Sequence, residues 1–358
     1  MISNISITAL KSFKESNVRI RPLTLLAGLN NSGKSTFIQA IRMYLAACNG
    51  NSPLLEGYGG VNDLRSNLTS ATSKIEIGMI FSDNSKDVME LSVNSLLPPK
   101  ICPESIYISA DRFGPKTSLP MNQSIDAVPI IGDRGEFVID YIQKLTDYGY
   151  LVPDSLIQKN SQGITFEYAL EGWLKEIAPG VKFKFSANPK TDTAHAEINS
   201  FRPTNVGFGL SYTLPIIASV LGASAYLNNL SEQVEWIKSW EASKSKNGRL
   251  LILENPEAHL HPQGQTAMGR LIALVAATGV QVVVETHSDH LMDGIRIAVK
   301  ELELKSENVI FHYFSKSESG ETLIDTPNLD GNGKLDFWPS GFFDQTIKNR
   351  AILAKRRS

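Results

Sequence analysis

Cysteine is scarce in this chain of 358 residues, which contains only Cys48 and Cys102. Two thiols could pair, but they cannot build the disulfide framework of a small secreted protein, so the sequence favours a reducing compartment. Long apolar runs are also missing, because no stretch of about 18 uncharged apolar residues is present to span a membrane. The first residues alternate apolar and polar side chains like a strand and lack the features of a signal peptide. We therefore expect a cytoplasmic protein that does not associate with a membrane.

An excess of charge of one sign is missing too. The 35 basic and 37 acidic side chains leave a net charge of −2, which gives no global attraction to nucleic acid. A basic run at residues 355–357 still leaves contact with nucleic acid open. Hydrophobic residues make up 42% of the chain and charged residues 20%, as in a globular protein with a sizeable core.

Apolar runs and helical spacing alternate along the chain, which is typical of an α/β fold. Residues 250–253 and 280–284 read as buried strands, and residues 263–277 between them have helical spacing. This strand–helix–strand order indicates a parallel sheet with covered faces. Further strands are expected at 2–8, 18–27, 75–81, 105–110, 181–187, 194–199 and 308–314, helices at 34–47, 136–147, 165–177 and 211–229, and loops at 50–74, 111–135 and 241–248.

Residues 28–35, GLNNSGKS, match the pattern G-x-x-x-x-G-K-[ST] of a phosphate-binding loop in full. An apolar strand precedes the loop and a helix follows it, so backbone N–H groups and the helix N-terminus can face a phosphate chain. In such a loop the lysine reaches the β- and γ-phosphates and the serine hydroxyl ligates Mg²⁺. The sequence therefore predicts ATP and Mg²⁺ as cofactors. The predicted binding residues are Gly28, Asn30, Asn31, Ser32, Gly33, Lys34, Ser35 and Thr36, with Ser35 also a metal ligand.

A carboxylate, Glu254, follows the apolar strand at 250–253. P-loop ATPases need an acid at this place to hold Mg²⁺, usually through water, so Glu254 is predicted as the second metal-binding residue. A strand end capped by a polar loop is the plain alternative. A separate metal site of Glu257, His259 and His261 is a further alternative, although no cysteine supports it.

The strand at 280–284 also ends in polar residues, ETHSDH at 285–290. Because the carboxyl ends of neighbouring parallel strands meet where open α/β sheets bind ligands, this segment is a candidate for the site. We predict that His287 contacts the γ-phosphate or the attacking water. An ordinary surface histidine after a strand is the alternative.

In this order, the P-loop, ENPEAHLHP at 254–262 and ETHSDH at 285–290 resemble the ABC-like ATPases of the OLD, RecF and SMC type. The chain further resembles bacterial AAA-type ATPases that carry a short C-terminal domain of unknown function, through SADRFGP at 109–115, RPTNVGFGLS at 202–211 and WPSGFFD at 338–344. The resemblance implies an α/β P-loop NTPase fold, an ABC-ATPase-like head with a mixed sheet, a helical lid and a small C-terminal domain. The expected divisions are 1–100 for the N-terminal half of the core with the P-loop, 101–200 for the lid, 201–305 for the C-terminal half and 306–358 for the C-terminal domain.

The resemblance also implies roles for particular residues. Gly207, Gly209 and Ser211 lie where this class keeps its signature loop, which contacts the γ-phosphate bound to the other subunit; an ordinary helix cap is the alternative. A homodimer assembled around ATP is therefore expected. Asn255 occupies the position where the class usually has a water-orienting glutamate. Either Glu257 serves instead, or hydrolysis is slow.

Three functions follow from the resemblance. The first is an ATPase switch, hydrolysing ATP to ADP and phosphate, whose dimer controls a partner effector encoded nearby; relatives in phage-defence loci imply an antiviral role. The second is a DNA-repair-type ATPase that acts directly on DNA, against which the absence of a coiled-coil arm and the charge balance argue. The third is an ABC transporter motor, which the segments at 109–115 and 254–262 do not resemble.

Overall fold

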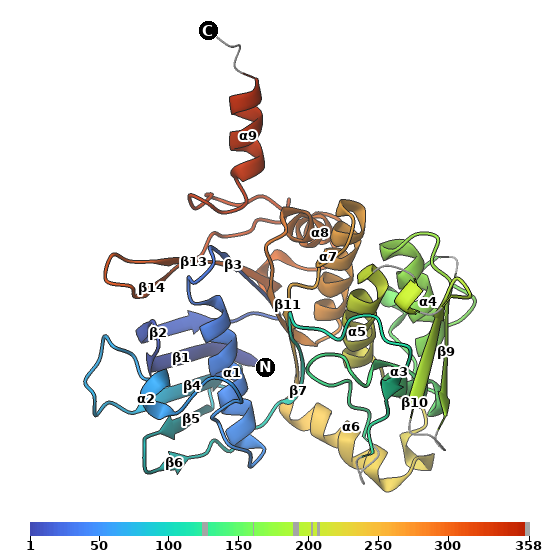
Figure 1. The fold of residues 1–358 in the computed structure, drawn as a ribbon, viewed down its shortest axis with the longest axis horizontal. Helices are drawn as coiled ribbons and strands as arrows, with labels where there is room; N and C mark the ends of the chain where they lie inside the picture. The colour runs from blue at the N-terminus through green and yellow to red at the C-terminus, as the bar shows by residue number, and fades with distance from the viewer. Residues whose placement is uncertain (124–127, 160, 189–192, 202, 206–207, 355–358) are drawn as a thin grey trace. The chain divides into compact units, whose positions relative to one another are not determined.

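The computed structural model describes residues 1–123, 128–159, 161–188, 193–201, 203–205 and 208–354 (Figure 1). The chain forms two compact units. Unit 1 consists of Met1–Pro103 together with Ser306–Ser358, and unit 2 of Glu104–Lys305. Whether residues 101–200 act as a lid stays a prediction.

Unit 1 contains an antiparallel sheet with the strand order β2-β1-β4-β5-β6. Apolar side chains alternate along its central strands, and Ile5, Ile7 and Ile77 are fully buried. Because successive side chains of a strand point to opposite faces, this alternation buries one face of the sheet, and helix α1 contacts β1 and β4. The bounds are Ile2–Leu10 for β1, Phe13–Arg19 for β2, Ile75–Phe81 for β4, Lys86–Leu91 for β5, Leu96–Leu97 for β6, Lys34–Cys48 for α1 and Val61–Leu64 for α2.

Unit 1 also supplies the strands β3 (Leu23–Gly28), β13 (Val309–Lys316) and β14 (Thr322–Asp325) in the order β14-β13-β3. β13 pairs in parallel with β3 and antiparallel with β14, so the predicted mixed sheet is confirmed. The prediction of one strand over 18–27 is wrong, because β2 ends at Arg19 and β3 begins at Leu23. Pro22 has no N–H to continue a ladder, and the Thr24 hydroxyl bonds to the backbone of Arg21, which turns the chain.

The segment at 338–344 folds onto β13. Phe342 is 1% exposed and its ring lies edge-on to Tyr313, with centroids 5.6 Å apart. Helix α9 (Gln345–Leu353) follows, and its last residues Ile352 and Leu353 are 65% and 83% exposed.

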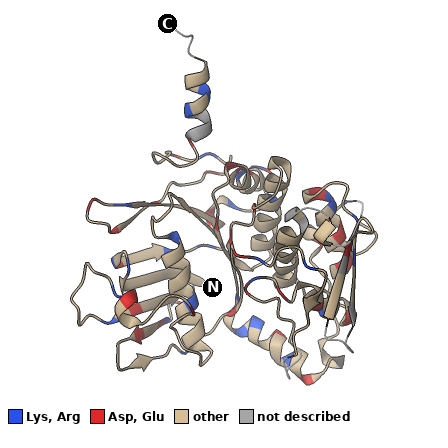
Figure 2. Cartoon of the chain, viewed as in Figure 1, with Lys and Arg blue, Asp and Glu red and all other residues tan. Residues whose placement is uncertain are grey.

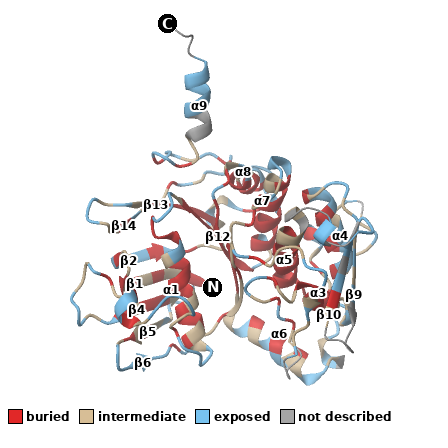
Figure 3. Cartoon of the chain, viewed as in Figure 1, coloured by how far each residue is buried: buried red, intermediate tan, exposed pale blue. Residues whose placement is uncertain are grey.

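Unit 2 is built around parallel strands in the order β12-β11-β7. β11 and β12 are apolar throughout their middles and α7 connects them, which confirms the predicted strand–helix–strand pattern; the buried character of α5, α7 and β12 is visible in Figure 3. A separate small sheet has the order β8-β10-β9. The bounds are Glu104–Ile108 for β7, Leu119–Pro120 for β8, Phe183–Asn188 for β9, Thr193–Ile198 for β10, Arg249–Glu254 for β11, Gln281–Glu285 for β12, Val138–Asp147 for α3, Phe166–Ile177 for α4, Phe208–Ser224 for α5, Glu235–Asn247 for α6, Pro262–Ala277 for α7 and Asp289–Lys300 for α8.

The predicted loop at 241–248 is wrong, because residues up to Asn247 belong to helix α6. One face of α6 is buried at helical spacing, through Ile237, Trp240, Glu241 and Lys244. Tertiary packing of this face stabilises the helix, although its polar composition is typical of a loop.

Acidic and basic side chains are interspersed over both units (Figure 2). Of the helices in the described ranges, none has both the length and the apolar content that crossing a bilayer requires.

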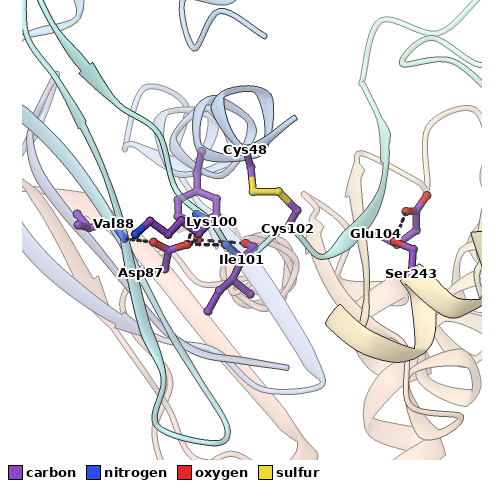
Figure 4. Close-up of a disulfide and its surroundings, with 9 residues drawn as sticks. Cys48, Asp87, Val88, Lys100, Ile101, Cys102, Glu104 and Ser243 are labelled. Carbon is purple, nitrogen blue, oxygen red and sulfur yellow. Dashed lines mark hydrogen bonds between the residues drawn. A yellow bond between two sulfur atoms is a disulfide. The ribbon is translucent and has the colours of Figure 1, made fainter. Parts of the chain in front are cut away.

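Cys48 and Cys102 form a disulfide, with Cα atoms 5.7 Å apart, although the scarcity of cysteine favours a reducing compartment (Figure 4). The cause lies in Asp87, whose carboxylate accepts hydrogen bonds from the N–H groups of Lys100 and Ile101 at 2.5 and 2.7 Å and from the Tyr44 hydroxyl of α1 at 3.0 Å. These bonds hold residues 100–101 beside α1, where Cys48 is the last helical residue.

Reducing this disulfide should destabilise the protein. The bond joins residues 54 apart, and freeing such a loop in the unfolded chain lowers the free energy of unfolding by about 2–4 kcal/mol. Urea unfolding with and without dithiothreitol measures the change. The Cys48→Ser/Cys102→Ser protein is the control and should have the lower stability in both conditions. Two titratable thiols in the folded, unreduced protein would contradict the pairing.

Candidate nucleotide-binding site

The predicted P-loop joins the end of β3 to the start of α1 in unit 1. Gly28 and Gly33 have φ values of 142° and 114°, which residues other than glycine rarely adopt. A Cβ atom on Gly28 would collide with the Phe314 carbonyl oxygen, and one on Gly33 with the Thr322 hydroxyl. Both glycines of the motif are therefore required by the fold of the loop.

The Lys34 side chain lies along the P-loop. Its ammonium donates hydrogen bonds to the carbonyl oxygens of Gly28 at 2.9 Å and Leu29 at 3.0 Å, and the residue is 4% exposed. The positive charge is therefore held at the loop itself, where a phosphate chain would lie against the backbone N–H groups.

Thr322 of β14 fixes the back of the P-loop. Its hydroxyl donates to the Ser32 carbonyl oxygen at 3.0 Å and lies 2.7 Å from the Ser12 hydroxyl, while its N–H donates to the Ser12 carbonyl oxygen at 2.9 Å. The loop is thus tied both to the turn between β1 and β2 and to β14.

The front of the P-loop is open. Asn30, Asn31 and Ser35 are exposed and Thr36 is half-buried, whereas Ser32 is buried. Within the described ranges, the Ser32 hydroxyl has no hydrogen-bond partner. Of the residues predicted to bind nucleotide, Asn30, Asn31 and Ser35 are thus exposed, whereas Ser32, Gly33 and Lys34 are buried.

In unit 2, Glu254 ends β11 beside the end of β7. Its carboxylate accepts hydrogen bonds from the Tyr107 hydroxyl at 3.1 Å and the Ala110 N–H at 3.2 Å, and the side chain remains half-exposed. In the parallel register Glu254 pairs with Glu285 at the end of β12, so the two predicted strand ends lie side by side. A carboxylate offers about four acceptor positions, so Glu254 keeps capacity for metal-bound water.

Arg112, from the SADRFGP segment, holds this strand end together. It is 1% exposed, and its guanidinium donates hydrogen bonds of 2.7–2.8 Å to the carbonyl oxygens of Ser109, Glu254 and Asn255. Burial lowers the pKa of Arg112, and Glu257 opposes that shift. The arginine therefore fixes the backbone on which Glu254 and Asn255 stand.

Asn255 has a left-handed backbone with φ of 45°. Asparagine is enriched in this conformation over other residues with a side chain, which gives a physical reason for an amide at this position. Its N–H donates to the Glu285 carbonyl oxygen at 2.9 Å, and its side-chain oxygen is buried without a hydrogen-bond partner in the described part of the chain.

Glu257 and His287 are brought together by the two strand ends. Glu257 is 8% exposed, and its Oε1 accepts the backbone N–H of His287 at 2.8 Å, while the side chain of His287 is exposed. The other oxygen, Oε2, is buried and has no hydrogen-bond partner among the described residues. Burial raises the pKa of Glu257, and the bond from His287 opposes that rise. This carboxyl is therefore protonated more readily than an exposed glutamate.

The AAA ATPase domain family matches residues 1–162 and 157–292, which is most of the chain. The chain belongs to the AAA ATPase domain family. A second family, described as a protein of unknown function (DUF3696), matches residues 304–351. No curated protein matches the sequence. As a member of the AAA ATPase domain family, the chain is a P-loop ATPase of a type that uses ATP.

Two solved Smc head domains have a similar fold. One is described as the SmcHead bound to the C-winged helix domain of ScpA; it is 13% identical, has a TM-score of 0.51, and the match covers 92% of this chain and 98% of that one. The other is an Smc head domain with an extended coiled coil bound to the C-terminal domain of ScpA derived from Pyrococcus furiosus, with 12% identity, a TM-score of 0.50 and 99% of both chains covered. These similarities confirm the predicted mixed α/β, ABC-ATPase-like head.

The predicted signature residues of this AAA ATPase lie at the start of α5. Gly209 and Ser211 belong to the first turns of the helix, whereas Gly207 lies outside the described residues. A Cβ atom on Gly209 would lie 3.4 Å from the His259 carbonyl oxygen, and the rings of Tyr212 and His259 are 4.6 Å apart. The start of α5 therefore packs on the loop that follows Glu254.

The alternative metal site finds no support in geometry. Across the described ranges, no group of three or more His, Cys, Asp or Glu side chains is arranged to hold a metal ion, and His259 and His261 are exposed.

Three residues that position the site were not singled out from the sequence, namely Tyr107, Arg112 and Thr322. Arg112 was noted only as part of a resembling segment. No local pattern in the sequence marks Arg112 as buried, because its carbonyl partners are set by the fold alone.

Proposed function

We propose that this AAA ATPase is a nucleotide-dependent switch that binds ATP·Mg²⁺, dimerises and hydrolyses the ATP slowly. The observation that supports this proposal best is the complete P-loop, with both glycines at positive φ and the Lys34 ammonium held at the loop carbonyls. A lysine ammonium at this place can form charge-assisted hydrogen bonds with the β- and γ-phosphates of a nucleotide.

Magnesium would be held by Ser35 and Glu254. The Ser35 hydroxyl is exposed at the start of α1, and Glu254 is half-exposed with acceptor positions left over. Hard oxygen ligands of these types suit Mg²⁺, so each of the two residues would serve as a ligand of the ion, either directly or through water.

For hydrolysis we assign Glu257 as the group that orients and deprotonates the attacking water. Its oxygen Oε2 is buried without a partner in the described part of the chain, whereas Asn255 carries an amide that cannot accept a proton from water. His287 is assigned to donate to the γ-phosphate, because its side chain is exposed beside Glu257.

The proposed dimer depends on the start of α5. Gly209 and Ser211 lie in the first turns of the long helix α5, whose N-terminal N–H groups favour an anion. If they contact the γ-phosphate bound to a second copy, only ATP joins both subunits. Both similar Smc heads are bound to domains of another protein, and we extend the proposal to an effector protein controlled by this dimer. Defence against phage is the proposed context, based on the resemblance of the sequence.

ATP should therefore convert monomers into dimers, and ADP should not, because only ATP carries the γ-phosphate that bridges the subunits. Light scattering of the protein with a non-hydrolysable ATP analogue, with ADP and without nucleotide measures this. Ser211→Arg, which places a bulky side chain at the start of α5, should bind the analogue as a monomer. A protein that stays monomeric with the analogue, or one that is a dimer with and without nucleotide, would contradict the proposed ATP-dependent dimer. Neither result would contradict ATP binding by the P-loop.

A further inference from the structure

Unit 2 contains a cavity of about 300 Å³ bordered by β7, β11 and α6. Neither Glu254 nor Glu257 lines it. Its walls include three aromatic side chains, Tyr107, Tyr141 and Trp240, together with Ile131 and Leu250. A largely apolar cavity of this size with a few polar groups has the character of a small-molecule site.

One polar group in the wall of the cavity lacks a partner. Tyr141 is 1% exposed, and its hydroxyl makes no hydrogen bond within the described ranges. Burial raises the pKa of Tyr141, so the hydroxyl keeps its proton and can donate it. Leaving a buried hydroxyl unpaired destabilises the fold, and a ligand with an acceptor atom would relieve that cost.

Three of the charged groups that line the cavity already have hydrogen-bond partners. The Lys244 ammonium donates to Glu241 at 2.5 Å and lies 3.5 Å from the centre of the Trp240 ring. Arg249 donates to the Ala223 carbonyl oxygen at 2.8 Å, and Glu104 accepts the Trp240 indole N–H at 3.0 Å. Each of these groups already has a hydrogen-bond partner, and the desolvation of a charged ligand in this largely apolar cavity would oppose binding.

We propose that this cavity binds a small uncharged molecule with a flat aromatic body and one hydrogen-bond acceptor, which receives the Tyr141 hydroxyl. The bound molecule would touch Tyr107, whose hydroxyl donates to Glu254 at 3.1 Å. It would thereby contact the side chain that holds the carboxylate at the end of β11.

Quinoline and naphthalene, which have the same shape but differ in one ring nitrogen, are the probes. Their dissociation constants are measured by ligand-observed NMR for the wild type and for Tyr141→Phe. Loss of a neutral hydrogen bond should raise the ratio of the quinoline constant to the naphthalene constant about three- to tenfold in Tyr141→Phe. Tyr168→Phe, a change on the surface of unit 2, should leave the ratio unchanged.

A second variant guards against a merely structural effect of the first. Ala223→Met fills part of the cavity and should weaken both probes together, without changing their ratio. A wild type that binds neither probe overturns the proposal, as does a ratio that Tyr141→Phe leaves unaltered. Retention of wild-type affinity for both probes in Ala223→Met would place their binding elsewhere and also overturn it.

Discussion

Substituting Gln for Glu257 should nearly abolish ATP hydrolysis while ATP binding persists. The amide keeps the size of the side chain and can still accept the N–H of His287, but it cannot take a proton from water. Loss of a general base lowers the rate about 100- to 10,000-fold. Single-turnover phosphate release, measured with protein in excess over ATP·Mg²⁺, gives the rate, and the dissociation constant is measured on the same protein.

Asn255→Glu is the matched test of the neighbouring position. The family resemblance places a glutamate there, whereas the left-handed backbone at 255 favours asparagine. If Glu257 is the base, Asn255→Glu should change the rate little. A Glu257→Gln protein at the wild-type rate, together with a large gain from Asn255→Glu, would remove Glu257 from the mechanism and identify a natural slow switch.

The dependence of hydrolysis on pH gives a further readout of the same assignment. Burial raises the pKa of Glu257, and only the deprotonated carboxylate can act as base. On acidification, the wild-type rate should therefore begin to fall at a higher pH than an ordinary exposed glutamate would impose. The residual rate of Glu257→Gln should lack this fall.

Lys34→Ala should weaken ATP·Mg²⁺ binding by about tenfold to a hundredfold, because it removes a charge-assisted contact worth about 1.5–3 kcal/mol. The lysine is buried along the loop, so the loss does not depend on an exposed, screened charge. Calorimetric titration measures the affinity. Lys86→Ala, which removes an exposed lysine of β5 in the same unit, is the control and should bind ATP as the wild type does. An unchanged affinity in folded Lys34→Ala protein would refute the P-loop assignment.

The parts of the site that the sequence predicted are those in which a short local pattern carries the chemistry. The P-loop is such a pattern, because its glycines, Lys34 and Ser35 are defined by contiguous spacing and by the strand and helix on either side. The strands β11 and β12 were also predictable, since apolar runs that end in polar residues mark buried parallel strands.

The parts that it did not predict depend on contacts between distant residues. Helix α6 has a polar composition, and the burial of one face, which includes Trp240 and Lys244, stabilises it as a helix. The disulfide depends on Asp87, which holds the segment before Cys102 next to α1. The position of Arg112 depends on hydrogen bonds to carbonyl oxygens more than 140 residues away in the sequence. Thr322 likewise packs behind the P-loop through contacts with residues about 290 and 310 positions earlier.

The most direct test of the central claim is a single-turnover experiment with ATP labelled on the γ-phosphate. Wild-type protein in excess over ATP·Mg²⁺ is passed through a filter that retains protein, and bound label and released phosphate are followed over time. We expect the label to be retained with the protein at first and then to leave as inorganic phosphate in a single slow phase. A folded protein that retains no label, or that retains ATP without ever releasing phosphate, would contradict the assignment of this chain as a slowly hydrolysing ATP switch.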